Sequence, residues 1–133
     1  MFFGDKELIF DKPLIMGIIN LTPDSFSDGG KFLKKNSDRD INKNKVQKEL
    51  EVLENNGASF IDIGAESTRP GHKTISIQQE IDRLMPALEL ISKSNCVISI
   101  DTRKPEVMKE ALKYPIGLIL SLIHIWRCRR PDW

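Results

Sequence analysis

Three short apolar segments, each followed by a helix-like stretch, most constrain how this 133-residue chain can fold. The segments are Leu14–Asn20, Phe60–Ile63 and Val97–Ile100, and polar or turn-forming residues follow each of them. The apolar run in the first segment is continuous, which is typical of a strand that is buried on both faces, and we interpret the two shorter segments as further buried strands. Strands that alternate with helices predict a parallel sheet joined by right-handed crossovers, and therefore a fold of the α/β class.

The segments between these strands carry helix signals. Ser76 and Gln79 form a capping box, and an apolar stripe with helical spacing follows them: Ile77, Ile81, Leu84, Leu88 and Ile91. Apolar positions 41, 46, 50 and 53 predict an earlier helix that Gly57 ends. Pro105 marks the first turn of a third helix. Residues 31–44 are polar and predict a mobile loop that leads into the first helix.

Two architectures satisfy three consecutive strand–helix units: an open doubly wound sheet and a (β/α)8 barrel. Neither of the first two strands is followed by GxGxxG or GxxxxGK[ST], so the dinucleotide-binding and P-loop forms of the open sheet lose support. A complete barrel takes about 250 residues. We therefore predict a partial TIM (β/α)8 barrel that holds the first three βα units, with Ile116–Ile125 as a candidate fourth strand.

Polar side chains follow each of the three predicted strands. Asn20 ends the first strand, Glu66–Arg69 lie just beyond the second, and Asp101–Arg103 end the third. Parallel strands present their carboxyl ends at one edge of the sheet, where ligands bind in α/β proteins. Polar residues also end buried strands that bind nothing, so position alone does not separate a binding site from simple strand termination.

The residue types at this edge favour an anionic ligand with a heterocyclic ring. Asp101 offers a carboxylate that can accept from paired N–H donors of a heterocycle. Thr68 and Arg69 offer a hydroxyl and a fork-shaped cation, which suit phosphate. Asn20 offers a neutral oxygen, which suits Mg²⁺ when diphosphate oxygens and waters supply its other ligands. The turn-rich segment Thr22–Gly30 has the character of a lid.

Three segments of the chain resemble the signature regions of the dihydropteroate synthase family, the pterin-binding barrel enzymes of folate synthesis. They are MGIINLTPDSFSDGG (Met16–Gly30), DIGAESTRPG (Asp62–Gly71) and SIDTRKPEV (Ser99–Val107), in the family's order. The resemblance covers residues 8–114. It implies a transferase that condenses 6-hydroxymethyl-7,8-dihydropterin diphosphate with p-aminobenzoate, giving 7,8-dihydropteroate and pyrophosphate. It also implies that full-length members form homodimers.

The resemblance assigns substrate contacts to four residues of this chain. Asn20 would be the Mg²⁺-linked contact to the diphosphate, and Asp101 would bind the pterin ring. Thr68 would contact the diphosphate-bearing substrate. Phe26, in the first loop, would help to form the p-aminobenzoate pocket.

Two further residues are implied to act in catalysis. Asp28 of the first loop and Arg69 of the second would, together with Phe26, close over the diphosphate and help to form the p-aminobenzoate pocket. Asp62 lies inside a buried strand, and we interpret it as a hydrogen-bonded residue of the barrel wall rather than a site residue.

The composition of the chain changes at about Tyr114. Every lysine lies at or before Lys113, whereas both tryptophans and three arginines follow it. The family's glycine-containing approach to strand four is replaced by PIGLILSLIHIWRCRRPDW, and the later Lys and Arg-x-His of the family have no counterpart. We therefore divide the chain into a pterin-binding domain, residues 1–114, and a non-family tail, residues 115–133, that arises from a frameshift, a chimeric join or an assembly artefact.

Composition narrows the choice of partners. A net charge of +1 gives no electrostatic reason to expect nucleic acid or a membrane surface. A cytoplasmic location is the default expectation, because charged residues interrupt the N-terminal segment MFFGDKELIF where a secretory signal would be apolar. The family resemblance implies small-molecule substrates. Three hypotheses follow: a dihydropteroate synthase-type transferase, a pterin-dependent corrinoid methyltransferase relative, and a non-catalytic truncated fragment. The TPDSFSD loop argues against the second, because a diphosphate lid has no purpose in methyl transfer.

Overall fold

The computed structural model describes residues 1–23, 32–35, 37, 39–66 and 74–120. Four parallel strands form its central sheet, in the order in which they occur along the chain: β3 (Ile15–Asn20), β4 (Ala58–Gly64), β5 (Val97–Asp101) and β6 (Ile116–Leu120). Three helices connect consecutive strands: α1 (Lys43–Asn55), α2 (Ile77–Ile91) and α3 (Pro105–Ala111). A separate antiparallel pair precedes them: β1 (Phe2–Phe3) and β2 (Lys6–Glu7).

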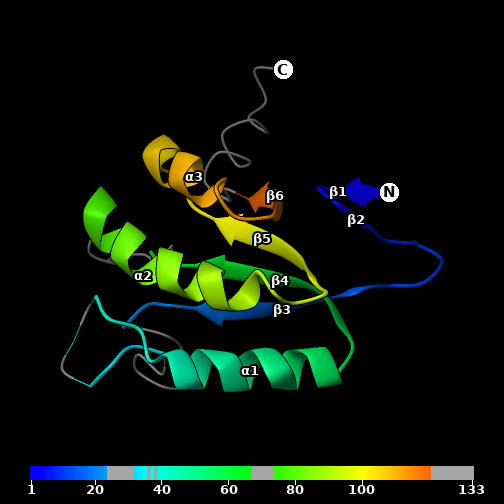
Figure 1. Ribbon diagram of the computed structural model, residues 1–133, viewed down its shortest axis with the longest axis horizontal. Helices are drawn as coiled ribbons and strands as arrows, with labels where there is room; N and C mark the ends of the chain where they lie inside the picture. Colours follow the sequence, from blue (N-terminus) through cyan, green and yellow to red (C-terminus); the bar gives the residue numbers. More distant parts are fainter. Residues whose placement is uncertain (24–31, 36, 38, 67–73, 121–133) are drawn as a thin grey trace, which may run out of the picture.

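The helices all lie on one side of the sheet (Figure 1). An open doubly wound sheet would carry helices on both faces, whereas one arc of a (β/α)8 barrel carries them only on the outside. The sequential strand order and the one-sided helices therefore agree with the predicted partial barrel, and β6 is the predicted fourth strand. The structure ends this strand at Leu120, and the remaining predicted residues, 121–125, lie outside the described part of the chain.

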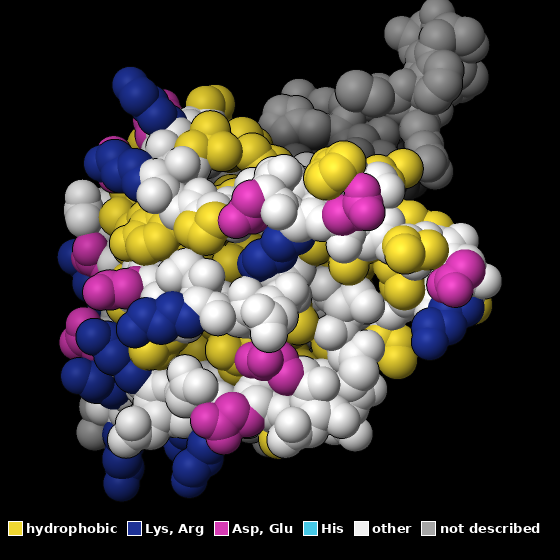
Figure 2. Space-filling model, turned by 45° about the vertical axis from the view of Figure 1, so that its right-hand side comes forward, with side chains coloured by type: hydrophobic (Ala, Val, Ile, Leu, Met, Phe, Trp, Pro, Cys, Tyr) yellow, Lys and Arg dark blue, Asp and Glu magenta, His cyan; other side chains and the backbone are white. Residues whose placement is uncertain are grey.

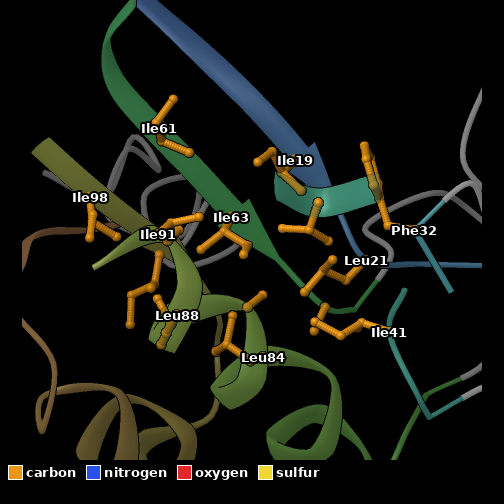
Figure 3. Close-up of a cluster of buried hydrophobic side chains, with 14 of the residues drawn as sticks. Ile19, Leu21, Phe32, Ile41, Ile61, Ile63, Leu84, Leu88, Ile91 and Ile98 are labelled. Atoms are coloured by element: carbon orange, nitrogen blue, oxygen red, sulfur yellow. The ribbon is translucent and has the colours of Figure 1, made fainter. Parts of the chain in front are cut away.

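The side of the sheet that faces the helices is apolar and closely packed. Five of its isoleucines have no exposed surface: Ile19, Ile61, Ile63, Ile98 and Ile100. All five belong to one cluster with Leu84, Leu88 and Ile91 of α2. Figure 3 shows Ile63 and Ile98 beside Leu88 and Ile91. Burial of such side chains contributes about 1.5–3 kcal/mol each, so this face holds the strands and helices together. The opposite side would face the axis of a closed barrel, and we call it the inner face.

The β1–β2 hairpin covers the amino-terminal end of the inner face. The ring of Phe3 meets the ring of Phe60 edge-on, with centroids 5.2 Å apart. The Lys6 ammonium donates hydrogen bonds to the backbone carbonyls of Ser94 and Cys96, at 3.0 and 2.6 Å. The hairpin is thereby tied to the start of β5 and packs on Phe60 of β4, whereas Ile15 and Met16 of β3 are 56% and 36% exposed.

Two helices, α2 and α3, begin at the residues that the sequence indicates, whereas α1 begins at Lys43, after the predicted start at about Ile41. Ser76 caps α2, because its hydroxyl accepts a hydrogen bond from the backbone N–H of Gln79 at 3.1 Å. Asn42 caps α1 in the same way through the N–H of Lys45. Pro105 opens α3, as predicted.

The apolar stripe predicted for α2 is correct only in its second half. Leu84, Leu88 and Ile91 are buried, but Ile77 is 39% exposed. The first turns of α2 instead bury Glu80 and Arg83, which are 1% and 2% exposed. Charged residues are almost never buried without partners, so these two side chains indicate a polar network beneath the helix.

The prediction of a mobile loop at residues 31–44 is wrong for its apolar members. Phe32, Leu33 and Ile41 are buried in the core, and Leu33 pairs with Ile41 in an antiparallel bridge. The N–H of Lys34 also donates to the carbonyl of Asp40 at 2.7 Å. This segment covers the carboxyl end of β3 at the helix face, where Leu21 is fully buried.

Basic and acidic side chains are interspersed over the face shown in Figure 2. No helix in the part of the chain that the structure describes is long and apolar enough to cross a membrane.

Substituting Gly117 tests how tightly the hairpin packs on β6. A Cβ at Gly117 would lie 2.6 Å from Val97 Cγ1 and 3.1 Å from the backbone oxygen of Phe3. Gly117→Ala should therefore destabilise the fold by about 1–3 kcal/mol in urea denaturation, because backbone cannot move aside cheaply. Gly17→Ala is the matched control, since its Cβ would meet only the flexible end of Leu53, at 2.7 Å, and it should cost less. Equal losses for the two variants would contradict this packing.

Candidate functional site

One row of residues crosses the sheet at its carboxyl edge. Asn20 is in register with Gly64, Gly64 with Asp101, and Asp101 with Leu120. Residues in one row share a face, so Asn20 and Asp101 both lie on the inner face, two strands or roughly 10 Å apart. Gly64 lies between them and has no side chain to fill the space. A Cβ there would lie only 3.5 Å from Asp101 Cβ, in ordinary contact.

The next row toward the amino-terminal end holds a second carboxyl group. Ile18, Asp62, Ser99 and Leu118 are in register, and the Ser99 hydroxyl donates to Asp62 Oδ1 at 2.8 Å. Burial raises the pKa of Asp62, and the hydrogen bond from Ser99 opposes the rise. The interpretation of Asp62 as a hydrogen-bonded residue of the barrel wall agrees with this contact.

The Asp101 carboxyl group is the most perturbed one at this edge. Burial raises its pKa to about 6, and the negative charges of Asp62 and Glu80 add to the rise. No described residue donates a hydrogen bond to this side chain, so both oxygens can accept from a ligand. A pKa of about 6 leaves the carboxylate as the main form at neutral pH, and a carboxylate can accept hydrogen bonds from paired N–H donors.

Asn20 is the residue of this edge that could contact a metal ion. Its side chain is exposed on the inner face. The described residues contain no group of three or more His, Cys, Asp or Glu side chains placed to hold a metal. The predicted contact of Asn20 with Mg²⁺ stays a prediction.

Behind the row lies a buried ion cluster, which we define as Glu66, Glu80, Thr102 and Lys104. Lys104 Nζ donates to Glu66 Oε2 at 2.9 Å and lies 3.7 Å from Glu80 Oε1. The Thr102 hydroxyl donates to Glu80 Oε2 at 2.7 Å. Glu66 Oε1 accepts a further hydrogen bond from Arg103 Nε at 2.9 Å. The cluster joins the end of β4, the first turns of α2 and the turn after β5.

The two acidic groups of the cluster respond to it in opposite ways. Burial acts to raise the pKa of Glu66, but the contacts from Lys104, Ile75 N–H and Arg103 outweigh it and hold the pKa below its usual value. Burial raises the pKa of Glu80, and the hydrogen bond from Thr102 and the charge of Lys104 do not cancel the rise. Glu80 Oε1 accepts no hydrogen bond from the described part of the chain.

The structure brings together part of the predicted site. Asn20 and Asp101 share one face and one edge of the sheet, as their positions at strand ends predicted. Phe26, Asp28, Thr68 and Arg69 lie outside the described residues, so their predicted roles stay predictions.

Sequence reasoning missed the buried ion cluster. Glu80 is a charged residue and was therefore not counted in the apolar stripe of α2. Positions 80, 84, 88 and 91 nevertheless keep helical spacing, which places Glu80 on the same face as the buried residues. Its partners Thr102 and Lys104 lie more than 20 residues away along the chain. A test of alternative stripes for α2 would have found a carboxylate on the buried face.

Replacement of Asp101 should stabilise the fold at neutral pH. Its folded pKa, about 6, lies above the ordinary value of 3.8, so its stabilising effect is complete below about pH 4 and is lost as the pH rises through 6. Asp101→Asn should therefore raise the free energy of unfolding at pH 7 by roughly 1 kcal/mol, discounted because solvent screens a partly exposed group. Urea denaturation at pH 4 and pH 7 measures this, with the exposed Asp5→Asn as control. A parent chain whose stability rises across this range relative to Asp101→Asn would contradict the sign.

Comparison with known proteins identifies the family. A sequence profile described as pterin binding enzyme matches residues 16–121. The dihydropteroate synthases of Clostridium beijerinckii and Escherichia coli are 42% and 43% identical to this chain, over 121 and 120 residues. Each alignment covers 90% of this chain but only 42% and 40% of the relative, so the chain spans about two fifths of the length of these curated relatives.

Solved structures of the same enzyme share the fold. A Yersinia pestis dihydropteroate synthase in complex with a sulfonamide drug gives a TM-score of 0.79 at 37% identity, covering 91% of this chain and 42% of that one. A Burkholderia cenocepacia dihydropteroate synthase complexed with 7,8-dihydropteroate gives 0.70 at 35% identity, covering 96% and 38%. These neighbours are TIM barrels, which confirms the predicted partial barrel.

The profile match includes β6 and ends one residue beyond it. The domain boundary predicted at residue 114 rests on the composition change and on the missing family sequence after it, and it stays a prediction. The matches in sequence and in structure confirm the family resemblance, and the chain belongs to the pterin-binding enzyme family.

Proposed function

We propose that this chain carries the pterin and diphosphate side of a dihydropteroate synthase site. The reaction joins 6-hydroxymethyl-7,8-dihydropterin diphosphate to p-aminobenzoate and releases pyrophosphate. The observation that carries the proposal is the row at the carboxyl edge, where Asn20 and Asp101 face the same side across Gly64. A roughly 10 Å span with no intervening side chain suits a ligand that binds by a ring at one end and by a diphosphate at the other.

Asp101 would hold the pterin ring in this proposal. Its two oxygens accept hydrogen bonds from none of the described residues, and an ionised carboxylate pairs well with adjacent N–H donors of a heterocycle. Charge-assisted hydrogen bonds of this kind are about twice as strong as neutral ones. Asp62 and Ser99 lie one row deeper and satisfy each other, which leaves Asp101 as the acceptor that a ligand meets first.

Asn20 would hold the diphosphate through Mg²⁺. When bound, the metal would neutralise charge on the diphosphate oxygens as pyrophosphate departs. Thr68 is proposed to contact the diphosphate-bearing substrate. Arg69 and Asp28 would act on the leaving pyrophosphate, and Phe26 would line the p-aminobenzoate pocket. The bond from the pterin methylene carbon to the diphosphate oxygen breaks, and a bond from that carbon to the arylamine nitrogen forms with loss of a proton.

The chain on its own is proposed to bind substrate without completing the reaction. The sheet described here has four of the eight strands that close a TIM barrel, so the site has only part of its wall. A non-catalytic form of this chain is therefore the second candidate. The corrinoid methyltransferase alternative gains no support, since each relative named above is a dihydropteroate synthase. We also propose a cytoplasmic location and, for full-length members, a homodimer.

Calorimetric titration with 6-hydroxymethyl-7,8-dihydropterin diphosphate tests the proposal. Asp101→Asn should weaken binding by about 10–100-fold, because hydrogen bonds to a charged group contribute roughly 1.5–3 kcal/mol. Asn20→Ala should weaken binding only when Mg²⁺ is present. Asp5→Asn, at the opposite end of the sheet, should change nothing.

Turnover with p-aminobenzoate tests the second part of the proposal. The 133-residue chain should form no dihydropteroate, and turnover that disappears in Asp101→Ala would refute its inactivity. Binding that Asp101→Asn leaves unchanged would refute the assigned pterin contact.

A further inference from the structure

The buried ion cluster is placed where it can act on Asp101. Thr102 follows Asp101 directly, and consecutive residues at a strand end project to opposite faces of the sheet. The Thr102 hydroxyl is fixed on the helix face by Glu80 Oε2 at 2.7 Å. Its backbone N–H donates to the carbonyl of Leu120 on the neighbouring strand at 3.2 Å. These two contacts hold the peptide that carries Asp101 and leave its side chain on the inner face.

A second set of contacts holds Glu80 itself. Lys104 Nζ lies 3.7 Å from Glu80 Oε1 and 2.9 Å from Glu66 Oε2, and it donates to the carbonyl of Ile75 at 2.8 Å. Arg83, one turn along α2 from Glu80, donates to the carbonyl of Ala65 at 2.8 Å. The first turns of α2 are thus tied to the end of β4 from two positions.

Stability alone does not account for a carboxylate at position 80. Glu80 is 1% exposed, and its Oε1 accepts no hydrogen bond from any residue that the structure describes. A buried ion pair is often no more stable than apolar residues of the same volume, because removal of both charges from water is costly. A buried charge of this kind can instead serve to fix a particular geometry. Here Glu80 holds Thr102, and Thr102 directly follows Asp101.

We propose that Glu80 is a positioning residue for Asp101, acting through the Thr102 hydroxyl, with Lys104 as its counter-ion. The proposal rests on the function proposed above, in which Asp101 holds the pterin ring. Its chemistry is specific: an acceptor at position 80, a hydroxyl at position 102 and a cation at position 104 are all required. The negative charge of Glu80 also acts on Asp101 through space, in agreement with its contribution to the raised pKa of Asp101.

Three variants separate positioning from simple structural support. Thr102→Val keeps the shape of the side chain and removes the hydroxyl, whereas Thr102→Ser keeps the hydroxyl. Glu80→Gln keeps an acceptor for Thr102 and removes the charge. The exposed ion pair between Glu110 and Lys113, 2.8 Å long, offers Glu110→Gln as the matched control for loss of one negative charge.

Two measurements are made on each variant of the 133-residue chain. The first is the titration of the Asp101 carboxyl carbon by NMR, and the second is calorimetric binding of 6-hydroxymethyl-7,8-dihydropterin diphosphate. Thr102→Val should weaken binding by about tenfold or more and shift the Asp101 titration, and Thr102→Ser should restore both. Glu80→Gln should lower the Asp101 titration midpoint below its value in the parent, because a neighbouring negative charge is gone, whereas Glu110→Gln should not move it.

The outcomes distinguish this inference from the proposed function. A parent chain that binds no dihydropterin diphosphate would refute the proposed function, and the Asp101 titration would still test the positioning. Folded Thr102→Val with parent-like titration and affinity would overturn the inference. If Thr102→Val does not fold, Thr102→Ala removes the same hydroxyl and takes its place. A folded Thr102→Ala with parent-like titration and affinity overturns the inference, and weakened binding that Thr102→Ser restores supports it.

Discussion

The hydrogen-bonded register of the four parallel strands is the constraint on which the rest of this structure depends. Side chains alternate along a strand, so register alone decides that Asn20, Gly64 and Asp101 share one row and one face. A slip of one residue would turn every side chain of a strand to the other face. The isoleucines beneath α2 prevent such a slip, because it would expose them on the inner face. Residues that touch no ligand therefore determine where the polar groups lie.

The buried ion cluster fixes the ends of the strands, which the register alone does not hold in place. Apolar packing specifies the faces of the sheet, but it is non-directional and leaves the ends of strands free to bend. Hydrogen bonds have direction, and those of Glu66, Glu80, Thr102 and Lys104 lie where β4 and β5 stop pairing. Two acidic groups near one lysine cannot both be fully compensated, which agrees with the low pKa of Glu66 and the raised pKa of Glu80. The cluster is therefore not electrostatically optimal, but its directed hydrogen bonds define the geometry of the strand ends.

Local patterns predicted the strands, the helix starts and the polar edge, and contacts between distant residues account for the misses. Strand and helix signals depend on spacing within a few residues, which the sequence states directly. The burial of Glu80 depends on Thr102 and Lys104, and no local pattern contains those partners. The burial of Phe32 and Leu33 has a similar cause, since short apolar pairs within a polar segment are decided by the surface that they meet. Sequence therefore predicted which edge bears the site, but not what holds that edge in place.

The residues of the inner face change from apolar to polar along the strands, which explains why the site lies at one end of the sheet. Along each of three strands its residues pass from large and apolar to small or polar: Met16, Ile18 and Asn20 on β3, Phe60, Asp62 and Gly64 on β4, and Val97, Ser99 and Asp101 on β5. The N-terminal hairpin stacks Phe3 on Phe60 and so covers part of the apolar end. The carboxyl end carries the polar groups Asn20 and Asp101, and Gly64 between them adds no side chain to that row. The same gradient raises the pKa of Asp101, since a carboxyl group at the boundary between an apolar barrel wall and solvent is only partly hydrated. Partial hydration is also what makes Asp101 a strong acceptor for a ring that displaces its remaining water, so its burial and its proposed role have one physical origin.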